Sequence, residues 1–353
     1  MGRIGTFLEV AYGAMHRAPD RGAVDRARDL EAMDRAVELA AGVRGTTSPN
    51  PWVGCVVVAG GEVFEGATAP PGGPHAEAVA LAGAGPRARG ATLYVTLEPC
   101  AHTGRTGPCA QAIVEAGVAR VVVAMEDPDP RVRGRGLARL RQAGIQVEVG
   151  LQAERVAEQL APYLKHRATG RPWVVLKLAA TLDGRLAAPD GTSRWITGPE
   201  ARADAHRLRA ESDAVLVGAG TVRADDPRLT VRLAGDGGRQ PLRVVLGRAP
   251  AGARVHPALE LGGAPGEVLE QLGARGVLQV LVEGGARVAH EFHAAGLVDR
   301  YVLYLAPALM GGDDGTPLFA GPGAQSMAEV WRGRLVSVRR LGEDLRVELA
   351  PRP

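Results

Sequence analysis

Three short motifs, Pro74-His75-Ala76-Glu77, Pro99-Cys100 and Pro108-Cys109, carry the most information about how this chain folds. One histidine and two cysteine thiolates are ligands suited to a tetrahedral Zn²⁺ ion. Three protein ligands leave the fourth position for water, which is typical of a catalytic site, whereas four ligands are typical of a structural one. We therefore expect the fold to bring His75, Cys100 and Cys109 together around one catalytic zinc ion per chain.

Glu77 follows His75 by two residues, near the start of a predicted helix, so it can lie beside a zinc-bound water without binding the metal. Zinc lowers the pKa of such a water towards 7, and Glu77 is expected to take the proton and deliver it to a departing amine. Taken singly, these residues would more often be a core histidine and buried cysteines. Their order resembles the zinc deaminases, His-x-Glu followed by Pro-Cys-x-x-Cys, but with eight residues between the cysteines.

Valine-rich runs alternate with alanine-rich amphipathic segments along the chain, which predicts an α/β protein with helices packed on largely buried sheets. In the first half we expect strands at residues 53–59, 93–97, 118–125 and 145–150. We expect helices at 30–42, 76–81, 109–116 and 133–143, and a connecting helix at 151–168. Cys55 lies inside the first strand and is expected to be a core residue.

Turn signals in Ala168-Thr169-Gly170-Arg171-Pro172 indicate a domain boundary, and 353 residues suit two domains. We expect a poorly ordered extension at residues 1–29, one domain at 30–168 and a second at 171–353. Strands in the second domain are predicted at residues 173–178, 214–218, 243–246, 278–283, 301–306 and 345–349.

The charge balance argues against some partners. Forty-two Lys and Arg oppose 39 Asp and Glu, for a net charge of +3, and the arginines are scattered among acids. We therefore expect no nucleic-acid partner. No apolar run approaches the roughly 20 residues of a membrane span, and the N-terminus lacks a signal-peptide core, so we expect a cytoplasmic protein without a membrane partner. An odd count of three cysteines favours metal binding or catalysis over disulfides.

The long loop between the two cysteines indicates which group of zinc deaminases this chain resembles. The segments Thr46-Thr47-Ser48-Pro49-Asn50-Pro51, Glu98-Pro99-Cys100-Ala101-His102-Thr103-Gly104-Arg105 and Asp127-Pro128-Asp129-Pro130 closely resemble the deaminase half of the bifunctional riboflavin-biosynthesis enzymes, over residues 30–165. That family deaminates a diaminopyrimidinone carrying a phosphoribosylamino arm. The resemblance implies that Asn50 contributes to the pyrimidine pocket, although a plain turn asparagine would look the same. Asp129 stands where the family more often has asparagine.

The second half contains Lys177-Leu178-Ala179-Ala180-Thr181-Leu182-Asp183-Gly184-Arg185 and, after a predicted strand, Gly218-Ala219-Gly220-Thr221. No third glycine stands at the position that the dinucleotide fingerprint requires, and the residues alone indicate only turns at strand ends. These segments nevertheless resemble the reductase half of the same family, which is related in fold to dihydrofolate reductase, over residues 171–319. The resemblance implies that NADPH reduces the ribosyl group to a ribityl chain.

The resemblance also implies which residues form the second site. The implied cofactor-binding residues are Ala180, Trp195, Thr221, Asp225, Gly285, Ala286, Arg287, Val288, Ala289, His290 and Glu291. The implied substrate-binding residues are Ser193, Arg209, Leu229, Arg232 and Glu283. A guanidinium suits a phosphate because it donates two parallel hydrogen bonds. We assign Lys177 to substrate orientation or to proton supply.

The segment at residues 256–282 is shorter than is usual in this family, as if a strand and a helix were absent. Within it, Gly262-Gly263-Ala264-Pro265-Gly266 is predicted to be a loop. Because the family tends to associate through the reductase half, we also expect a homo-oligomer.

The predicted fold is thus a cytidine-deaminase-like three-layer domain followed by a dihydrofolate-reductase-like α/β domain. The predicted function is zinc-dependent deamination of a phosphorylated pyrimidine, followed by NADPH-dependent reduction. One alternative is a nucleic-acid base deaminase, which needs a basic channel with stacking aromatics, whereas only 4% of residues here are aromatic. Another is a structural zinc module joined to a nucleotide-binding scaffold, for which the sequence offers no convincing fourth ligand.

Overall fold

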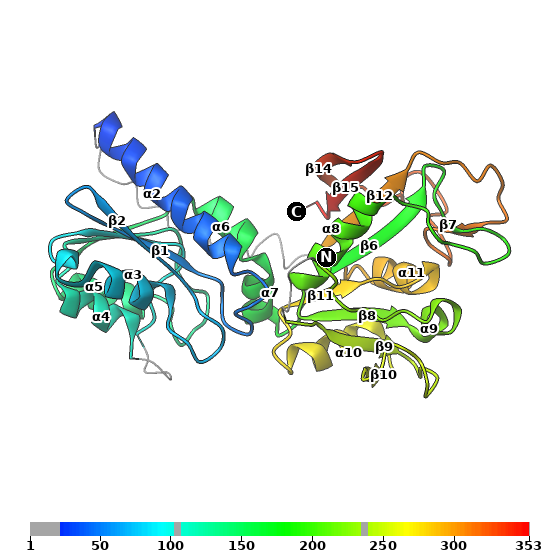
Figure 1. Cartoon of the computed structure of the whole chain (residues 1–353), viewed down its shortest axis with the longest axis horizontal. Helices are drawn as coiled ribbons and strands as arrows, with labels where there is room; N and C mark the ends of the chain where they lie inside the picture. The colour runs from blue at the N-terminus through cyan, green and yellow to red at the C-terminus, as the bar shows by residue number, and fades with distance from the viewer. Residues whose placement is uncertain (1–21, 102–106, 234–238, 353) are drawn as a thin grey trace. The chain divides into compact units, whose positions relative to one another are not determined.

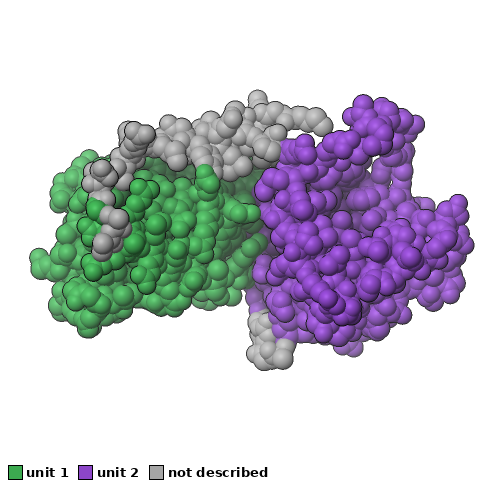
Figure 2. Space-filling model, turned by 90° about the horizontal axis from the view of Figure 1, so that it is seen from above, with its two compact units in different colours: residues 1–169 green, residues 170–353 purple. Residues whose placement is uncertain are grey.

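In the computed structural model of the chain, the described residues are 22–101, 107–233 and 239–352. The chain divides into two compact units, residues 1–169 and 170–353, which Figure 2 colours separately. The division lies inside the turn predicted at residues 168–172. His102 and residues 1–21 of the predicted extension lie outside the described residues. Among the helices of the described part, none combines the length and apolarity needed to cross a membrane.

The first unit contains a five-stranded sheet in the order β2-β1-β3-β4-β5 (Figure 1). Its strands are β1 (Gly54–Ala59), β2 (Glu62–Ala67), β3 (Thr92–Val95), β4 (Arg120–Val123) and β5 (Gln146–Val149). β1 is antiparallel to β2 and β3, whereas β3, β4 and β5 are mutually parallel. The four predicted strands are confirmed, and β2 is an additional edge strand. Cys55 is fully buried in β1, as expected.

Helices cover both faces of this sheet, which confirms the three-layer prediction. They are α2 (Ala23–Gly42), α3 (Ala76–Ala84), α4 (Cys109–Ala116), α5 (Arg135–Gln142), α6 (Ala153–Gln159) and α7 (Ala161–Thr169). A Cβ on Gly54 would lie 1.9 Å from the Ala36 carbonyl oxygen of α2, and one on Gly66 would lie 2.1 Å from the Ala76 carbonyl oxygen of α3. Gly66 pairs with Cys55, the neighbour of Gly54, so the two glycines face opposite sides of the sheet.

Two helix predictions in this unit need correction. α2 begins at Ala23, so residues 23–29 belong to a helix and not to a poorly ordered extension. Asp29 explains this, because its buried carboxylate accepts a hydrogen bond from the Tyr94 hydroxyl at 2.6 Å and pairs with Arg120 at 2.7 Å. The connecting segment at 151–168 forms two helices, which are separated at Leu160.

The second unit contains an eight-stranded sheet in the order β10-β9-β8-β11-β6-β12-β15-β14 (Figure 1). Its strands are β6 (Trp173–Thr181), β8 (Ala214–Gly218), β9 (Leu242–Leu246), β10 (Leu259–Leu261), β11 (Gln279–Val282), β12 (Arg300–Ala306), β14 (Arg334–Leu341) and β15 (Asp344–Ala350). The first six in this order are parallel, and the last two are antiparallel additions. All six predicted strands are present. β7 (Arg185–Ala187) pairs with β13 (Thr316–Pro317) in a separate ribbon.

The helices of this unit are α8 (Pro199–Ala210), α9 (Ala219–Asp225), α10 (Pro265–Gly273) and α11 (Ala286–Ala294). Leu208 of α8 and Val222 of α9 pack into one apolar cluster, and Leu269 of α10 and Phe292 of α11 pack into another. The short segment at residues 256–282 contains a strand, β10, and a helix, α10, before β11. The predicted loop at 262–266 is wrong for its last two residues, because α10 begins at Pro265, a residue favoured in the first turn of a helix.

A buried carboxylate, Glu98, joins the loop after β3 to the loop after β4. It accepts hydrogen bonds from the backbone N–H groups of Asp127 (3.3 Å), Gly134 (2.9 Å), Gly136 (2.9 Å) and Leu137 (3.3 Å). Gly136 also lies against the chain beside Cys100, since a Cβ there would be 1.9 Å from the Pro99 carbonyl oxygen. The segment at residues 127–137 is thus fixed beside Cys100.

We predict that Glu98→Gln lowers the free energy of unfolding of the first unit by about 2–4 kcal/mol. The glutamine amide has one acceptor oxygen in place of two. Its NH₂ group would face backbone N–H groups that are also donors, so some of these buried donors would lose their hydrogen bonds. Chemical denaturation followed by circular dichroism measures this change. The exposed Glu126 provides the matched control, and Glu126→Gln should stay within about 0.5 kcal/mol of the parent. Equal effects of the two substitutions would contradict the role given to Glu98.

Candidate active sites

The three predicted zinc ligands lie together in the first unit. His75 Nδ1, Cys100 Sγ and Cys109 Sγ are all within 4.8 Å of one another. His75 Nδ1 is 3.6 Å from Cys100 Sγ and 3.3 Å from Cys109 Sγ. Zinc–nitrogen and zinc–sulfur bonds of about 2.1 and 2.3 Å at a tetrahedral angle separate nitrogen from sulfur by about 3.6 Å. The three ligand atoms are therefore close enough together to bind a single zinc ion.

Two helix starts hold these ligands. His75 is the residue before α3, and Cys109 is the first residue of α4. The free backbone N–H of Cys109 donates to Cys100 Sγ at 3.4 Å, as unpaired amides at a helix start commonly do to anions. Hydrogen bonding with Cys109 and His75 lowers the pKa of the Cys100 thiol to about 4, despite its burial. Cys100 is therefore prepared to act as a thiolate ligand.

Glu77 lies in the first turn of α3, where its side chain approaches this cluster. The residue is 4% exposed, and burial raises the pKa of its carboxyl to about 7. It interacts with both Cys109 and His75. Glu77 thus occupies the place beside the ligands that the sequence predicted, without belonging to the ligand set found among the described residues.

A cavity of about 410 Å³ opens onto the cluster and includes His75, Glu77 and Cys100 in its wall. Asn50 also lines it, as predicted. The local turn anticipated for Asn50 is present too, because its backbone N–H donates to the Thr47 carbonyl at 2.9 Å. The turn and the pocket assignments for Asn50 are therefore compatible.

Several residues of the cavity wall were not assigned to the site from the sequence, although Glu98, Asp127 and Asp129 lie in the motifs that resemble the deaminase family. Besides Glu98, the wall contains Asp127, Asp129, Arg131, Tyr163 and Arg167. The first three come from the loop after β4, which lies beside β3, so their position could have been inferred from two adjacent parallel strands ending at one sheet edge. Tyr163 and Arg167 come from α7, far along the chain, and no local pattern marked them.

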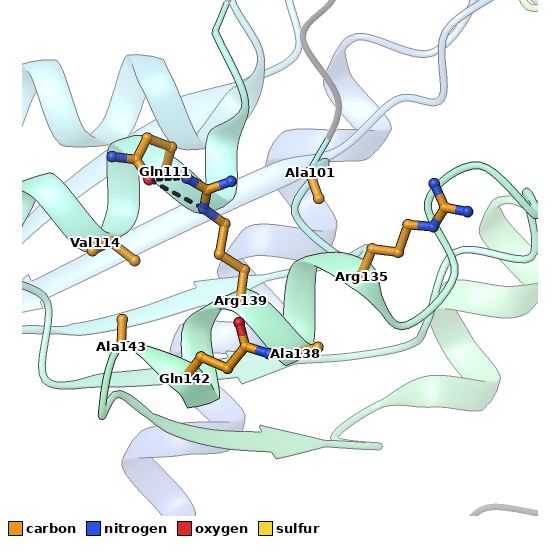
Figure 3. Close-up of a pocket in the computed structure, with 8 residues that line it drawn as sticks. All are labelled: Ala101, Gln111, Val114, Arg135, Ala138, Arg139, Gln142 and Ala143. Carbon is orange, nitrogen blue, oxygen red and sulfur yellow. Dashed lines mark hydrogen bonds between the residues drawn. The ribbon is translucent and has the colours of Figure 1, made fainter.

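A second hollow in this unit, of about 570 Å³, lies between α4 and α5 and is drawn in Figure 3. Its wall combines Arg135, Arg139 and Gln142 with Gln111 and small apolar residues. Arg139 reaches across to Gln111, with its Nη2 donating to the Gln111 Oε1 atom. None of the predicted site residues lines this hollow, so we place the active site of this unit in the cavity at His75.

The second unit brings three of its predicted site residues together. Glu283 directly follows β11, and its side chain is 8% exposed. Arg209 of α8 donates to it through Nε at 2.5 Å and Nη2 at 2.8 Å. Lys177 of β6, the neighbouring strand, has its Nζ 3.9 Å from Glu283 Oε2. The Arg209 guanidinium, which the sequence assigned to a substrate phosphate, instead donates its paired hydrogen bonds to Glu283.

The charges of this cluster are strongly coupled. Burial alone would raise the pKa of Glu283, but the positive charge and hydrogen bonds of Arg209, with Lys177, lower it to about 2. Burial lowers the pKa of Lys177, and Glu283 opposes that change. His206, one turn before Arg209 on α8, was not predicted; burial and then the charges of Arg209 and Arg232 lower its pKa to about 4. The i, i+3 spacing of His206 and Arg209 was an available signal.

Thr221 and the predicted cofactor-binding segment at residues 285–291 lie where two helices start beside each other. β8 and β11 are adjacent parallel strands, and they lead into α9 and α11. The Gly285 backbone N–H at the start of α11 donates to Thr221 Oγ1 of α9 at 3.2 Å. Gly284 must be small, because a Cβ there would lie 2.5 Å from Val288 Cβ. Adjacent carboxyl ends of parallel strands are the usual ligand-binding edge of such sheets.

The other predicted residues of this half are distributed as follows. Ala180 is buried in β6, and within α11 Ala286 and Ala289 are buried while Arg287 and Glu291 are exposed. Trp195 is 70% exposed. The residue before it, Arg194, donates a hydrogen bond from Nη2 to the backbone carbonyl of Asp225. Ser193 is half-buried in the same loop, Arg232 is exposed, and Val288 and His290 are half-buried.

Leu229 differs from the expectation of a substrate-facing side chain. It is 2% exposed and packs in an apolar cluster. Its φ of 52° lies in the left-handed region, which a residue with a branched side chain rarely adopts. Such an outlier is typical of segments held in place for function, and the next residue, Thr230, gives its carbonyl to Arg209 at 3.2 Å.

Comparisons with known proteins agree with this division. The family profile for the cytidine and deoxycytidylate deaminase zinc-binding region matches residues 26–125. The profile for the RibD C-terminal domain matches residues 172–347. The two matches coincide with the two units described above.

Whole-chain relatives were also found. Riboflavin biosynthesis protein RibD of Escherichia coli is 41% identical over 351 residues, covering 87% of this chain and 95% of the relative. RibD of Mycobacterium tuberculosis is 46% identical over 325 residues, covering 88% and 94%. The structure of Acinetobacter baumannii RibD superimposes with a TM-score of 0.88 at 40% identity, covering 93% of this chain and 99% of that one. The chain therefore belongs to the RibD family, the bifunctional enzymes of riboflavin biosynthesis that join a zinc-binding deaminase domain to a reductase domain.

Proposed function

We propose that the first unit converts 2,5-diamino-6-(5-phosphoribosylamino)pyrimidin-4-one to 5-amino-6-(5-phosphoribosylamino)uracil, and that the second unit then reduces the ribosyl group with NADPH. The observation that carries the proposal is the set of His75, Cys100 and Cys109 ligand atoms, with Glu77 beside them, in the wall of one cavity. A related Thermotoga maritima structure, at 36% identity and a TM-score of 0.85, is of a protein named for this same pair of activities.

In the deaminase, a bound zinc ion supplies a water activated for attack on the amino-bearing pyrimidine carbon. Glu77 accepts a proton from that water and delivers it to the amino group, which leaves as ammonia. Asn50 lies in the same cavity wall and orients the pyrimidine through its side-chain amide, which both donates and accepts hydrogen bonds. Water provides the oxygen of the new carbonyl, so the reaction is a hydrolysis.

In the reductase, a bound NADPH would provide the hydride needed to reduce the anomeric carbon of the opened ribose ring. We assign NADPH to the edge formed by Thr221, Asp225 and the start of α11 at Gly285, where an N–H-rich helix start favours an anionic group. Lys177 orients the substrate or supplies the proton that accompanies the hydride. Burial lowers the pKa of Lys177 and Glu283 opposes that lowering, while Arg209 lowers the pKa of Glu283 and so keeps it ionised.

Association and location remain predictions. We propose a homo-oligomer that forms through the second unit, where β14 is an edge strand of the sheet and its Leu335 and Val338 are more than half exposed. Light scattering measures this directly. No nucleic-acid partner is proposed, and the cytoplasmic location is retained as a prediction from the sequence.

The proposed function predicts the products of two incubations. Zinc-loaded protein given the phosphorylated diaminopyrimidinone should release ammonia with or without NADPH, and mass spectrometry should detect the ribityl product only when NADPH is present. Chelator-treated protein should lose ammonia release yet still reduce the deaminated compound, since the reductase residues lie in a separate unit. Protein that releases no ammonia under any of these conditions would refute the deaminase assignment.

Glu77→Gln should retain zinc and lose deamination by at least about 100-fold in kcat, because the amide cannot carry the proton. Metal analysis together with an ammonia assay separates the two effects. Reduction of the deaminated substrate by the same protein should remain within about twofold of the parent, which serves as the internal control. Full deamination by zinc-loaded Glu77→Gln protein would show that another group moves the proton.

Glu283→Gln should shift the pH dependence of the reductase. If protonated Lys177 is required, activity falls as pH rises through its pKa, which burial already places below that of a free lysine. Removing the negative charge of Glu283 lowers this pKa further, so the alkaline fall in kcat should move to lower pH. NADPH oxidation measured from pH 6 to 10 tests this, with Glu270→Gln on the exposed surface of α10 as the control. An unmoved profile would exclude Lys177 as the proton source.

A further inference from the structure

The wall of the deaminase cavity contains an arginine that forms no hydrogen bond through its Nε with the described residues. Arg167 of α7 lines the same wall as His75 and Glu77, and its side chain is 20% exposed. Its Nε is buried and has no hydrogen-bond partner among the described residues. Buried polar groups of native proteins are nearly always paired, so an unpaired guanidinium donor in a substrate cavity indicates that a ligand completes it.

Tyr163 orients the Arg167 guanidinium but does not form a hydrogen bond with its Nε. The Arg167 guanidinium carbon lies 5.1 Å from the centre of the Tyr163 ring, a cation–π distance that orients the side chain. Tyr163 directs its hydroxyl to Asp127, at 3.1 and 3.0 Å from the two carboxylate oxygens. The Asp129 backbone N–H also donates to Asp127, at 2.9 Å. Asp127 is therefore occupied by these partners and is not bonded to Arg167.

Asp129 is the carboxylate that forms an ion pair with Arg167, but its hydrogen bonds are made with Arg131. Arg131 donates to Asp129 from Nε at 3.0 and 3.2 Å and from Nη2 at 2.6 Å. The closest approach of Arg167 to Asp129 is 3.8 Å, which is beyond hydrogen-bond distance. The hydrogen bonds of Arg131 lower the pKa of Asp129 to about 2, so this carboxylate is charged at neutral pH. Without Arg131, it would repel an anionic ligand.

We propose that Arg167 binds the phosphate of the substrate's phosphoribosylamino arm in the deaminase cavity, and that Arg131 makes this binding possible by neutralising Asp129. The inference rests on the function proposed above and adds a determinant of specificity to it. A phosphate monoester carries between one and two negative charges at neutral pH and accepts paired hydrogen bonds, which is the geometry that a guanidinium offers. Arg131 and Arg167 are the two arginines in the cavity wall.

The first test compares phosphorylated with dephosphorylated substrate. Arg167→Met should raise the KM for the phosphorylated diaminopyrimidinone about 10–100-fold, the range expected for a lost charged hydrogen bond, with kcat within about threefold. The KM for the dephosphorylated riboside should not change. Inorganic phosphate should inhibit the parent competitively and the variant much less. Arg167→Lys, which keeps the charge but not the paired donors, should give an intermediate KM.

The second test separates neutralisation of Asp129 from direct binding. Arg131→Gln should raise the KM for the phosphorylated substrate, because it leaves Asp129 charged beside the phosphate. The double substitution Asp129→Asn with Arg131→Gln removes both charges and should restore KM to within about threefold of the parent. Failure of the double variant to recover would overturn the role given to Arg131.

Controls make each outcome decisive. Arg141→Met, on the exposed surface of α5 and outside both hollows, should leave every constant unchanged. Zinc content and melting temperature should match the parent in all variants, so that a folding defect is recognised. An unchanged KM in well-folded Arg167→Met protein overturns this inference but not the proposed function. Parent protein that does not deaminate the phosphorylated substrate overturns both.

Discussion

Each unit depends on one buried carboxylate that follows a central parallel strand. Glu98 comes after β3 and Glu283 after β11, and a carboxylate at such a place costs several kcal/mol unless its charge is compensated. Four backbone N–H groups compensate Glu98, whereas the Arg209 fork and the Lys177 ammonium compensate Glu283. Because these partners come from distant segments, satisfying the carboxylate also assembles the wall of the site.

The two solutions suit different chemistry. Amides at Glu98 hold the loop of residues 127–137 next to Cys100 and bring no charge of their own, so the metal ligands and Glu77 set the electrostatics near the reacting carbon. Glu283 is instead compensated by full charges, and it opposes the lowering of the Lys177 pKa that burial causes. One unit thus satisfies its buried carboxylate with neutral amides, and the other satisfies it with charged side chains.

Elements with a strong local pattern were predicted well. Valine-rich strands such as β4 and β8 are buried on both faces, so their composition identifies them. The edge strands β2 and β14 were missed because they are largely exposed and carry mixed polar residues. The start of α2 was missed because Asp29 and its charged neighbours resemble a solvated segment until Tyr94 and Arg120 are placed against that carboxylate. β10 and the first turn of α10 were not predicted, because β10 has only three residues and the glycines at 262, 263 and 266 indicate turns.

The sequence by itself identified the candidate zinc ligands, the candidate proton carrier Glu77 and the two-unit α/β organisation, since residue types in a fixed order restrict the metal chemistry and periodicity restricts the elements. It also marked Arg209, Glu283 and Lys177 through resemblance, but not that Arg209 would be engaged by Glu283. Only the tertiary structure decided which charges neutralise one another, as with Arg131 on Asp129, and which donor stays unpaired, as with Arg167 Nε. Such pairings join residues far apart in the chain, and Coulombic and hydrogen-bond energies depend on distance in space, which no local pattern encodes.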